Sequence, residues 1–100
     1  MQFIITAYDF TDEDAINRRL AHRDAHLAGI ERMTKAGNFL SGGAILDQQG
    51  KMIGSSAHVD FPSRADVDAW INSDPYTLGK VWDNVNISDG LLFPVEKFKR

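Results

Sequence analysis

The order of its strand-forming and helix-forming segments constrains the fold of this chain more than any other feature of the sequence. Residues 2–10 are rich in β-branched and aromatic side chains, which is typical of a strand. A long helical pattern follows, then two strand patterns joined by a turn, a second helical pattern and a last strand pattern. The order β-α-β-β-α-β predicts an α+β protein with the ferredoxin-like split arrangement, in which the helices cover one face of the sheet.

The long helical pattern predicts a first helix over about residues 12–36. Thr11 and Asp14 resemble a capping box at its start. Gly37 and Asn38 are residues at which helices commonly end.

The apolar side chains of this helix indicate which of its faces is buried. Four of them recur at helical spacing: Ile16, Leu20, Leu27 and Ile30. Arg23 falls inside that stripe, and His26 lies on its flank beside Arg19. We expect Arg19 to be solvated. A break of the helix near Leu20 would change which residues share a face. A guanidinium inside an apolar stripe needs a partner, for which Asp74 is one candidate, or it must reach the solvent.

The rest of the chain completes the pattern. The expected segments are a strand over 38–46, a turn over 47–50, a strand over 51–61, a helix capped by Ser63 and Asp66 that ends before Pro75, and a strand over 81–87. Residues 90–98 form either a short extra strand or an arm. Because the second face of the first strand, with Ile4 and Tyr8, is also fairly apolar, we expect two copies to pair through their sheets as a homodimer.

Length and composition narrow the class of protein. One hundred residues predict a single domain, 1–100. A net charge of −3 argues against nucleic acids and anionic membranes as partners, since both need a basic face. The absence of cysteine excludes thiolate chemistry and cysteine-based zinc sites. No apolar run reaches membrane-spanning length, so we expect a soluble, cytoplasmic protein.

Three segments together resemble the YciI-like (YCII-related) family: "RRLAHRDAHL" in the first helix, "GGAILDQQGKMIGSS" across the hairpin and "DPYTLGKVWDNVNI" near the end. The family pattern has an Arg-x-x-His-Leu sequence, a Gly-Ser in the third strand and an Asp-Pro-Tyr after the second helix. These fall on Arg23, His26 and Leu27, on Gly54 and Ser55, and on Asp74, Pro75 and Tyr76.

This resemblance implies a dimeric α+β barrel fold and a His-Asp pair, His26 and Asp74, in a cleft near the sheet. Most members of the family have no assigned reaction. One is similar to a dehydrochlorinase that acts on a chlorinated hydroxyhydroquinone, and related families include muconolactone isomerases and small monooxygenases. The chain departs from the family pattern at Gly42-Gly43, where a Gly-Pro is usual, and at Pro94, which lies later than the usual final proline.

The pair supports two interpretations. In the first, His26 acts as acid or base, because an imidazole accepts and donates protons near neutral pH, and Asp74 orients it. Arg23 then clamps a negatively charged group. In the second, the pair is structural and ties the first helix to the loop after the second helix.

Four further residues are candidates for contacts with a substrate. Ser55, which lies in no nucleophile motif, is either a ladder residue of its strand or lines the pocket, and Tyr76 either lines the pocket or only packs there. Gly42 and Gly43 would let a ligand approach the backbone closely, although glycines in a strand more often mark a bulge. His22 and His26 have a spacing that can hold a metal on one helix face, but no third ligand completes a motif. We therefore expect no metal and no cofactor.

The main functional hypothesis is cofactor-free proton transfer on a small molecule, of the lyase, isomerase or dehydrochlorinase type. The alternative is a non-catalytic module that binds a metabolite in the same cleft. A third hypothesis is a heme-type or quinone-type monooxygenase on the same fold.

Overall fold

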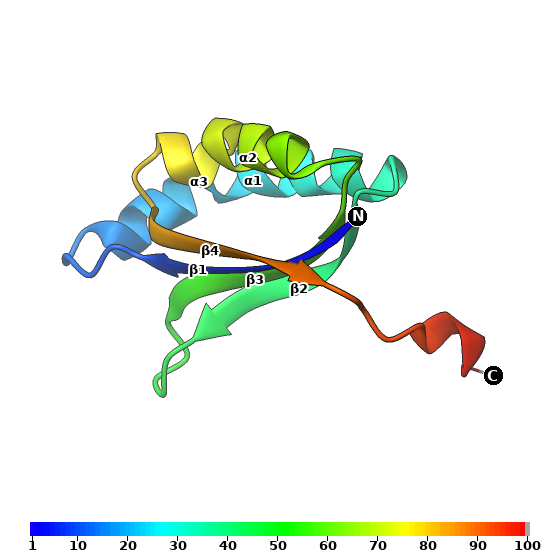
Figure 1. The fold of residues 1–100 in the computed structure, drawn as a ribbon. Helices are drawn as coiled ribbons and strands as arrows, with labels where there is room; N and C mark the ends of the chain where they lie inside the picture. The colour runs from blue at the N-terminus through cyan, green and yellow to red at the C-terminus, as the bar shows by residue number, and fades with distance from the viewer. Residues whose placement is uncertain (100) are drawn as a thin grey trace.

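The computed structural model describes residues 1–99 and confirms the predicted order of elements (Figure 1). Arg100, the last residue of the predicted 1–100 domain, lies outside the described residues. The elements are β1 (Gln2–Asp9), α1 (Ala15–Lys35), β2 (Phe39–Leu46), β3 (Met52–Asp60), α2 (Arg64–Ser73), α3 (Pro75–Leu78), β4 (Trp82–Gly90) and the 3-10 turn η1 (Val95–Lys97). None of the helices within residues 1–99 combines the length and apolar character needed to cross a membrane.

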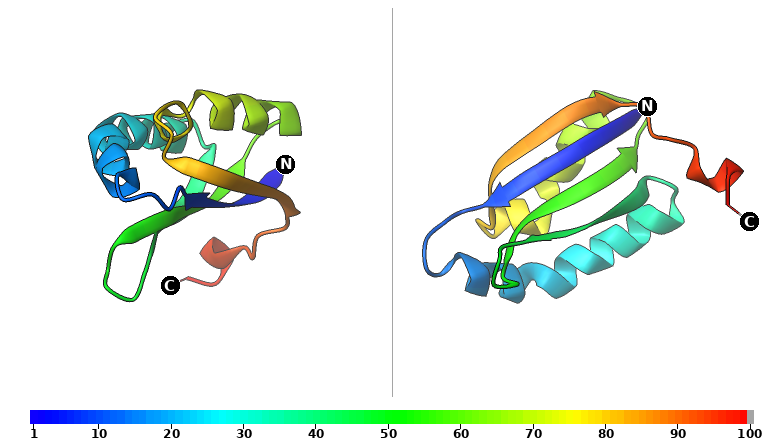
Figure 2. Two further views of the ribbon diagram at one scale, coloured as in Figure 1. Left: turned by 90° about the vertical axis from the view of Figure 1, so that its left-hand side faces the viewer. Right: turned by 90° about the horizontal axis from the view of Figure 1, so that it is seen from below.

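The four strands form one sheet in the order β2-β3-β1-β4, and every neighbouring pair is antiparallel. The helices lie together over one face of this sheet, and the opposite face is left uncovered (Figures 1 and 2). The predicted α+β ferredoxin-like fold is therefore confirmed.

Strand β1 shows how the sequence alternation builds these two faces. Phe3, Ile5 and Ala7 are buried beneath the helices, whereas Ile4 and Tyr8 lie on the uncovered face and are partly exposed. The same alternation continues across the sheet, because Phe3 pairs with Val59 and Ile5 with Ala57 of β3. The core of the molecule consequently lies between β1, β3 and the helix layer.

The start of α1 differs from the prediction. The helix begins at Ala15 rather than near residue 12, and the side chain of its N-cap residue, Asp14, makes no capping hydrogen bond. The carboxylate of Asp12 instead accepts two hydrogen bonds from Arg18, at 2.7 and 2.8 Å. The expected capping box of Thr11 and Asp14 is wrong, because the Asp14 carboxylate accepts a hydrogen bond from the Asn17 side chain at 3.0 Å and none from the backbone of the first turn.

The buried face of α1 also differs from the predicted apolar stripe. Leu20 and Leu27 are 54% and 42% exposed, while Arg19 and His26 are buried. The expectation that Arg19 is solvated is therefore wrong. Both polar residues find partners outside the helix, so burying them leaves few polar groups unsatisfied, and the two leucines stay partly exposed.

The end of α2 positions the part of the chain that carries Asp74. Ser63 caps the start of the helix as predicted, accepting a hydrogen bond from the Asp66 backbone N–H at 3.3 Å. The helix ends at Ser73, and Asp74 follows in an extended conformation with Pro75 at the first turn of α3. Asp74 is thus held in a tight corner between two helices.

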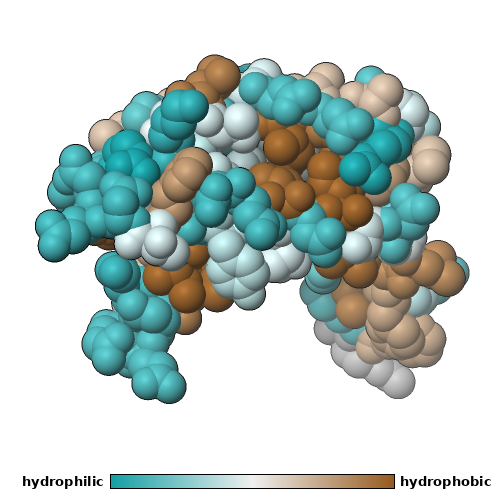
Figure 3. Space-filling model, turned by 60° about the vertical axis from the view of Figure 1, so that its left-hand side comes forward, coloured by the Kyte–Doolittle hydropathy of each residue, from teal (hydrophilic) through white to brown (hydrophobic). Residues whose placement is uncertain are grey.

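The residues after β4 form an arm, not a fifth strand. The chain leaves the sheet after Gly90 and carries the turn η1, so that this segment projects away from the body (Figures 1 and 2). Its apolar side chains Leu91, Phe93 and Phe98 are exposed. In Figure 3 the arm is a largely brown projection beneath the sheet, across a hollow from the hydrophilic tip of the β2–β3 hairpin.

Candidate active site

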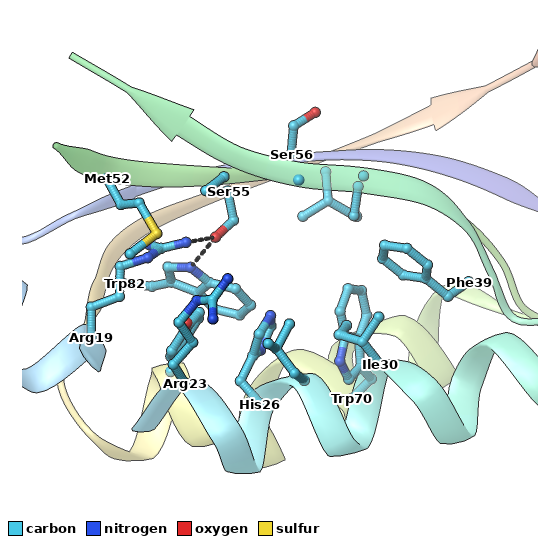
Figure 4. Close-up of a pocket in the computed structure, with 17 residues that line it drawn as sticks. Arg19, Arg23, His26, Ile30, Phe39, Met52, Ser55, Ser56, Trp70 and Trp82 are labelled. Carbon is cyan, nitrogen blue, oxygen red and sulfur yellow. Dashed lines mark hydrogen bonds between the residues drawn. The ribbon is translucent and has the colours of Figure 1, made fainter. Parts of the chain in front are cut away.

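A cavity of about 210 Å³ lies between α1 and the strands β2 and β3. Figure 4 shows that its two ends differ in character. Charged and hydrogen-bonding side chains gather at one end: Arg19, Arg23, His26 and Ser55. Apolar side chains enclose the other: Ile30, Phe39 and Trp70. The cavity can therefore take a small molecule with one polar end and one apolar end.

His26 and Asp74 lie in contact at the wall of this cavity, although 48 residues separate them along the chain. The Nδ1 atom of His26 lies 2.8 and 3.1 Å from the two carboxylate oxygens of Asp74. Because an ionised carboxylate only accepts hydrogen bonds, Nδ1 carries the proton of this contact. Nε2 has no partner among residues 1–99 and is left for the cavity, into which His26 points (Figure 4).

The Asp74 carboxylate also accepts hydrogen bonds from two groups other than His26. Its Oδ1 atom accepts the backbone N–H of Tyr76 at 2.9 Å, which caps α3, and its Oδ2 atom accepts the indole N–H of Trp70 at 3.2 Å. The carboxylate is therefore fixed from three directions.

The ring of His26 is fixed as well. It stacks on Tyr76 with centroids 3.9 Å apart, and Trp82 meets it edge-on at 5.8 Å. Burial raises the pKa of the Tyr76 hydroxyl, against the opposing charges of Arg19 and Arg23, so Tyr76 stays protonated at neutral pH. Tyr76 thus lines the cavity as a neutral side chain.

Arg19 forms a buried ion pair with Asp9, a residue that the sequence analysis did not select. Its Nη1 atom donates to both carboxylate oxygens, at 2.8 and 2.9 Å, and its guanidinium lies over the Tyr76 ring at 4.7 Å. Burial raises the pKa of the Asp9 carboxyl, and Arg19 opposes that rise. One signal could have revealed Asp9: it continues the buried series of Phe3, Ile5 and Ala7 by two residues.

Ser55 joins this ion pair to the aromatic side of the site. Its Oγ atom accepts a hydrogen bond from Nη2 of Arg19 at 2.7 Å and another from Nε1 of Trp82 at 3.1 Å. Ser55 lines the cavity and faces α1 across it (Figure 4). Trp82, which the sequence analysis placed only in a strand, is a further residue of the site.

Arg23 lies at the same end of the cavity and is exposed. It forms no ion pair with any residue between 1 and 99, and the candidate partner Asp74 is bound to His26. Its guanidinium points toward the cavity rather than out along the helix surface (Figure 4). The geometry leaves its donors available to a ligand.

Gly42 and Gly43 both line the cavity, but only one of them is required by packing. A Cβ atom on Gly42 would collide with the Ser56 carbonyl oxygen and lie 2.8 Å from the Phe39 ring. A Cβ atom on Gly43 would meet nothing within 4 Å.

The two histidines at helical spacing take different partners. Nδ1 of His22 lies 2.8 Å from the Arg18 carbonyl oxygen, while His26 contacts Asp74. Within residues 1–99 no three histidine or acidic side chains gather as a metal site would need.

The fold and site define an α+β protein of the ferredoxin-like fold with a histidine-aspartate pair in a cavity wall. The chain belongs to the YCII-related domain family, whose model matches residues 1–90. It is 29% identical over 93 residues to Protein YciI of Escherichia coli O6:H1 and of Shigella flexneri, an alignment that covers 87% of this chain and 93% of each relative.

Solved structures share the fold. The chain superposes with a TM-score of 0.79 on 5-chloro-2-hydroxyhydroquinone dehydrochlorinase from Burkholderia phenoliruptrix, solved in complex with 2,5-dihydroxybenzoquinone, at 22% identity over 91% of this chain and 94% of that one. A dimeric ferredoxin-like protein of unknown function from Jannaschia has a TM-score of 0.51 at 10% identity, covering 91% of this chain and 98% of that one. At these identities the likeness concerns the fold.

Proposed function

We propose that this protein is a small-molecule enzyme that performs cofactor-free general acid-base chemistry, with His26 as the proton carrier. One observation carries the proposal: the imidazole is held by Asp74 through Nδ1 and presents Nε2 to a cavity. A base must be oriented and must reach its substrate, and this arrangement supports both requirements.

In the proposed step, Nε2 of His26 takes a proton from a carbon or oxygen of the substrate. Asp74 stabilises the imidazolium that forms, and the electron pair left behind moves toward an oxygen of the substrate near Arg23. The imidazolium then returns the proton to another atom, as in an isomerase. In a lyase or dehydrochlorinase the electron pair returns from that oxygen, the leaving group departs with its bonding electrons, and His26 gives its proton to the solvent.

The class of substrate is proposed from the cavity and from the dehydrochlorinase that shares the fold. One end of the cavity is charged and the other apolar, which suits a small, oxygenated and mainly planar molecule. The dehydrochlorinase that shares the fold was solved with such a molecule, 2,5-dihydroxybenzoquinone. We propose cyclic enols and hydroxylated quinones as the substrates to test first.

The test compares the wild-type protein with the variant His26→Gln. Proton transfer is followed by NMR as deuterium uptake from D2O into a panel of cyclic enols and ketones, and chloride release is measured with 5-chloro-2-hydroxyhydroquinone. We expect the variant to lose about 10²- to 10⁴-fold in rate. The control is His22→Gln, one helical turn away, which should keep the wild-type rate. Equal rates for His26→Gln and the wild type would contradict the proposal.

A second function is favoured by the other bonds of Asp74. Because this carboxylate also caps α3 and holds Trp70, the alternative assigns the His-Asp pair a structural role in a metabolite-binding module. In that case the wild-type protein binds 2,5-dihydroxybenzoquinone in calorimetry but turns over no member of the panel.

We also propose that two copies pair through the uncovered sheet face. The apolar side chains on and beside that face support this assembly. A cytoplasmic location stays a prediction from the composition.

A further inference from the structure

The hydrogen bonds of Ser55 leave it only one way to bind a ligand. A hydroxyl oxygen has two acceptor positions and one proton. Nη2 of Arg19 and Nε1 of Trp82 occupy both acceptor positions, at 2.7 and 3.1 Å, and neither of these groups can accept a hydrogen bond in return. Among residues 1–99 no acceptor takes the Ser55 proton.

The surroundings of Ser55 also strengthen it as a donor. The Arg19 guanidinium is locked by its two bonds to Asp9, so its positive charge stays against the Ser55 oxygen. A hydroxyl that accepts from a cation is polarised, and its own proton is then given more readily to a third group. Because Arg19 is buried, water screens its charge less than at the surface, and the Asp9 carboxylate offsets only part of it.

We propose that Ser55 is a specificity-determining donor, which selects substrates with an enolate, phenolate or carboxylate oxygen at the polar end of the cavity. This inference rests on the proposed function in that it concerns the same substrate. Ser55 reaches the cavity from β3, while Arg23 and His26 reach it from α1 on the opposite side (Figure 4). An oxygen bound there meets the Ser55 proton from one wall and the Arg23 guanidinium from the other.

The positions of Ser55 and Arg23 also predict how the substrate is oriented in the cavity. Its oxygen lies between Ser55 and Arg23, and its apolar body extends toward Ile30, Phe39 and Trp70. When His26 removes a proton from a carbon next to a carbonyl, the negative charge develops on that carbonyl oxygen. Ser55 then binds the oxygen more tightly after proton removal than before it, which is the condition for accelerating this step.

The experiment uses 4-nitrophenol as the probe, because its phenol and phenolate forms absorb at different wavelengths. The absorbance of the bound probe is titrated with pH, which gives the ratio of affinities for phenolate and phenol. We expect the wild-type protein to favour the phenolate by about tenfold or more, because a hydrogen bond to a charged acceptor is stronger than one to a neutral acceptor. The variant Ser55→Ala should lose about tenfold of that preference.

A matched control lies next to it in the sequence. Ser56 is on the same strand, but its side chain points away from the cavity (Figure 4), and Ser56→Ala should keep the wild-type ratio. Circular dichroism verifies that each variant is folded. Because Ser55→Ala leaves two N–H donors without their acceptor, Ser55→Cys serves as a second variant: its thiol fits the same space but is a weak donor.

Two results would overturn the inference: folded Ser55→Ala or Ser55→Cys protein that favours phenolate as strongly as the wild type, or wild-type protein without saturable binding of 4-nitrophenol. The variant His26→Gln separates this inference from the proposed function. It should keep the phenolate preference while losing turnover. If instead His26→Gln keeps full turnover and Ser55→Ala still loses the preference, the acid-base role fails and the Ser55 inference stands.

Discussion

Arg19 and Asp9 are charged residues buried in the interior of this small protein, and their burial costs free energy. Their side chains are 3% and 5% exposed. Taking two charges out of water is costly, and their mutual attraction offsets this only while both partners are present. The pair also supports the site, because Arg19 donates to Ser55 and lies over Tyr76.

Replacing Arg19 with methionine should therefore destabilise the protein by about 3–5 kcal/mol, because it leaves Asp9 buried without a partner. Urea denaturation followed by circular dichroism measures the change. The control is Arg64→Met, which breaks the exposed pair with Asp68 and should cost no more than about 0.5 kcal/mol. A double variant, Asp9→Leu with Arg19→Met, should regain part of the loss, and an Arg19→Met protein as stable as the control would contradict this account.

Single residues also show what the sequence could reveal about the site. The family resemblance implies a contact between His26 and Asp74, and in the structure Nδ1 of His26 lies 2.8 Å from Oδ1 of Asp74. The burial of Arg19 was missed because an apolar stripe shows only the hydrophobic part of a buried face. A buried polar side chain is recognised by its partner, and Asp9 comes from another element of the fold.

At the scale of elements, the order of strands and helices was predictable because each pattern is local. The alternation in β1 and the cap at Ser63 depend on neighbouring residues. The start of α1 was predicted too early because the acidic residues before it have two kinds of partner, and Asp12 binds the Arg18 side chain. That competition is decided by the tertiary structure.

Two adjacent glycines of β2 test how closely this strand packs against β3 beside the cavity. Gly42→Ala should destabilise the protein by about 1–3 kcal/mol, because the new methyl group meets the backbone of β3. Gly43→Ala, one residue further, should be neutral or stabilise by up to about 1 kcal/mol, since it has open space and a glycine in a strand is itself unfavourable. Thermal unfolding of both variants measures the difference. Equal stability would show that β2 moves freely enough to absorb the methyl group.

At the scale of the whole molecule, the sheet is covered by helices on one face only. The uncovered face carries Ile4 and Tyr8, and the arm beside it exposes Leu91, Phe93 and Phe98. Exposed apolar surface of this kind on a small domain marks a surface for association. The predicted homodimer would cover it, with the helices and cavities on the outside.

The whole-molecule prediction is tested by sedimentation equilibrium. The wild-type protein should sediment with twice the mass of the chain, and Ile4→Lys should shift it toward the single chain, because a charge would be buried between two sheets. Leu78→Lys, on the helix layer and more exposed than Ile4 (69% against 37%), should leave the mass unchanged. A wild-type protein of single-chain mass would contradict the assembly, whatever the variants do.

The corner held by Asp74 has a consequence for anyone who wants to redirect this protein to another compound. One carboxylate keeps the imidazole in place, begins α3 and anchors the Trp70 indole. A substitution of Asp74 intended to change reactivity alone would also disturb the start of α3 and the position of Trp70. New selectivity is therefore easier to obtain at Ile30 and Phe39, whose hydrocarbon side chains can be exchanged for others without breaking any polar contact.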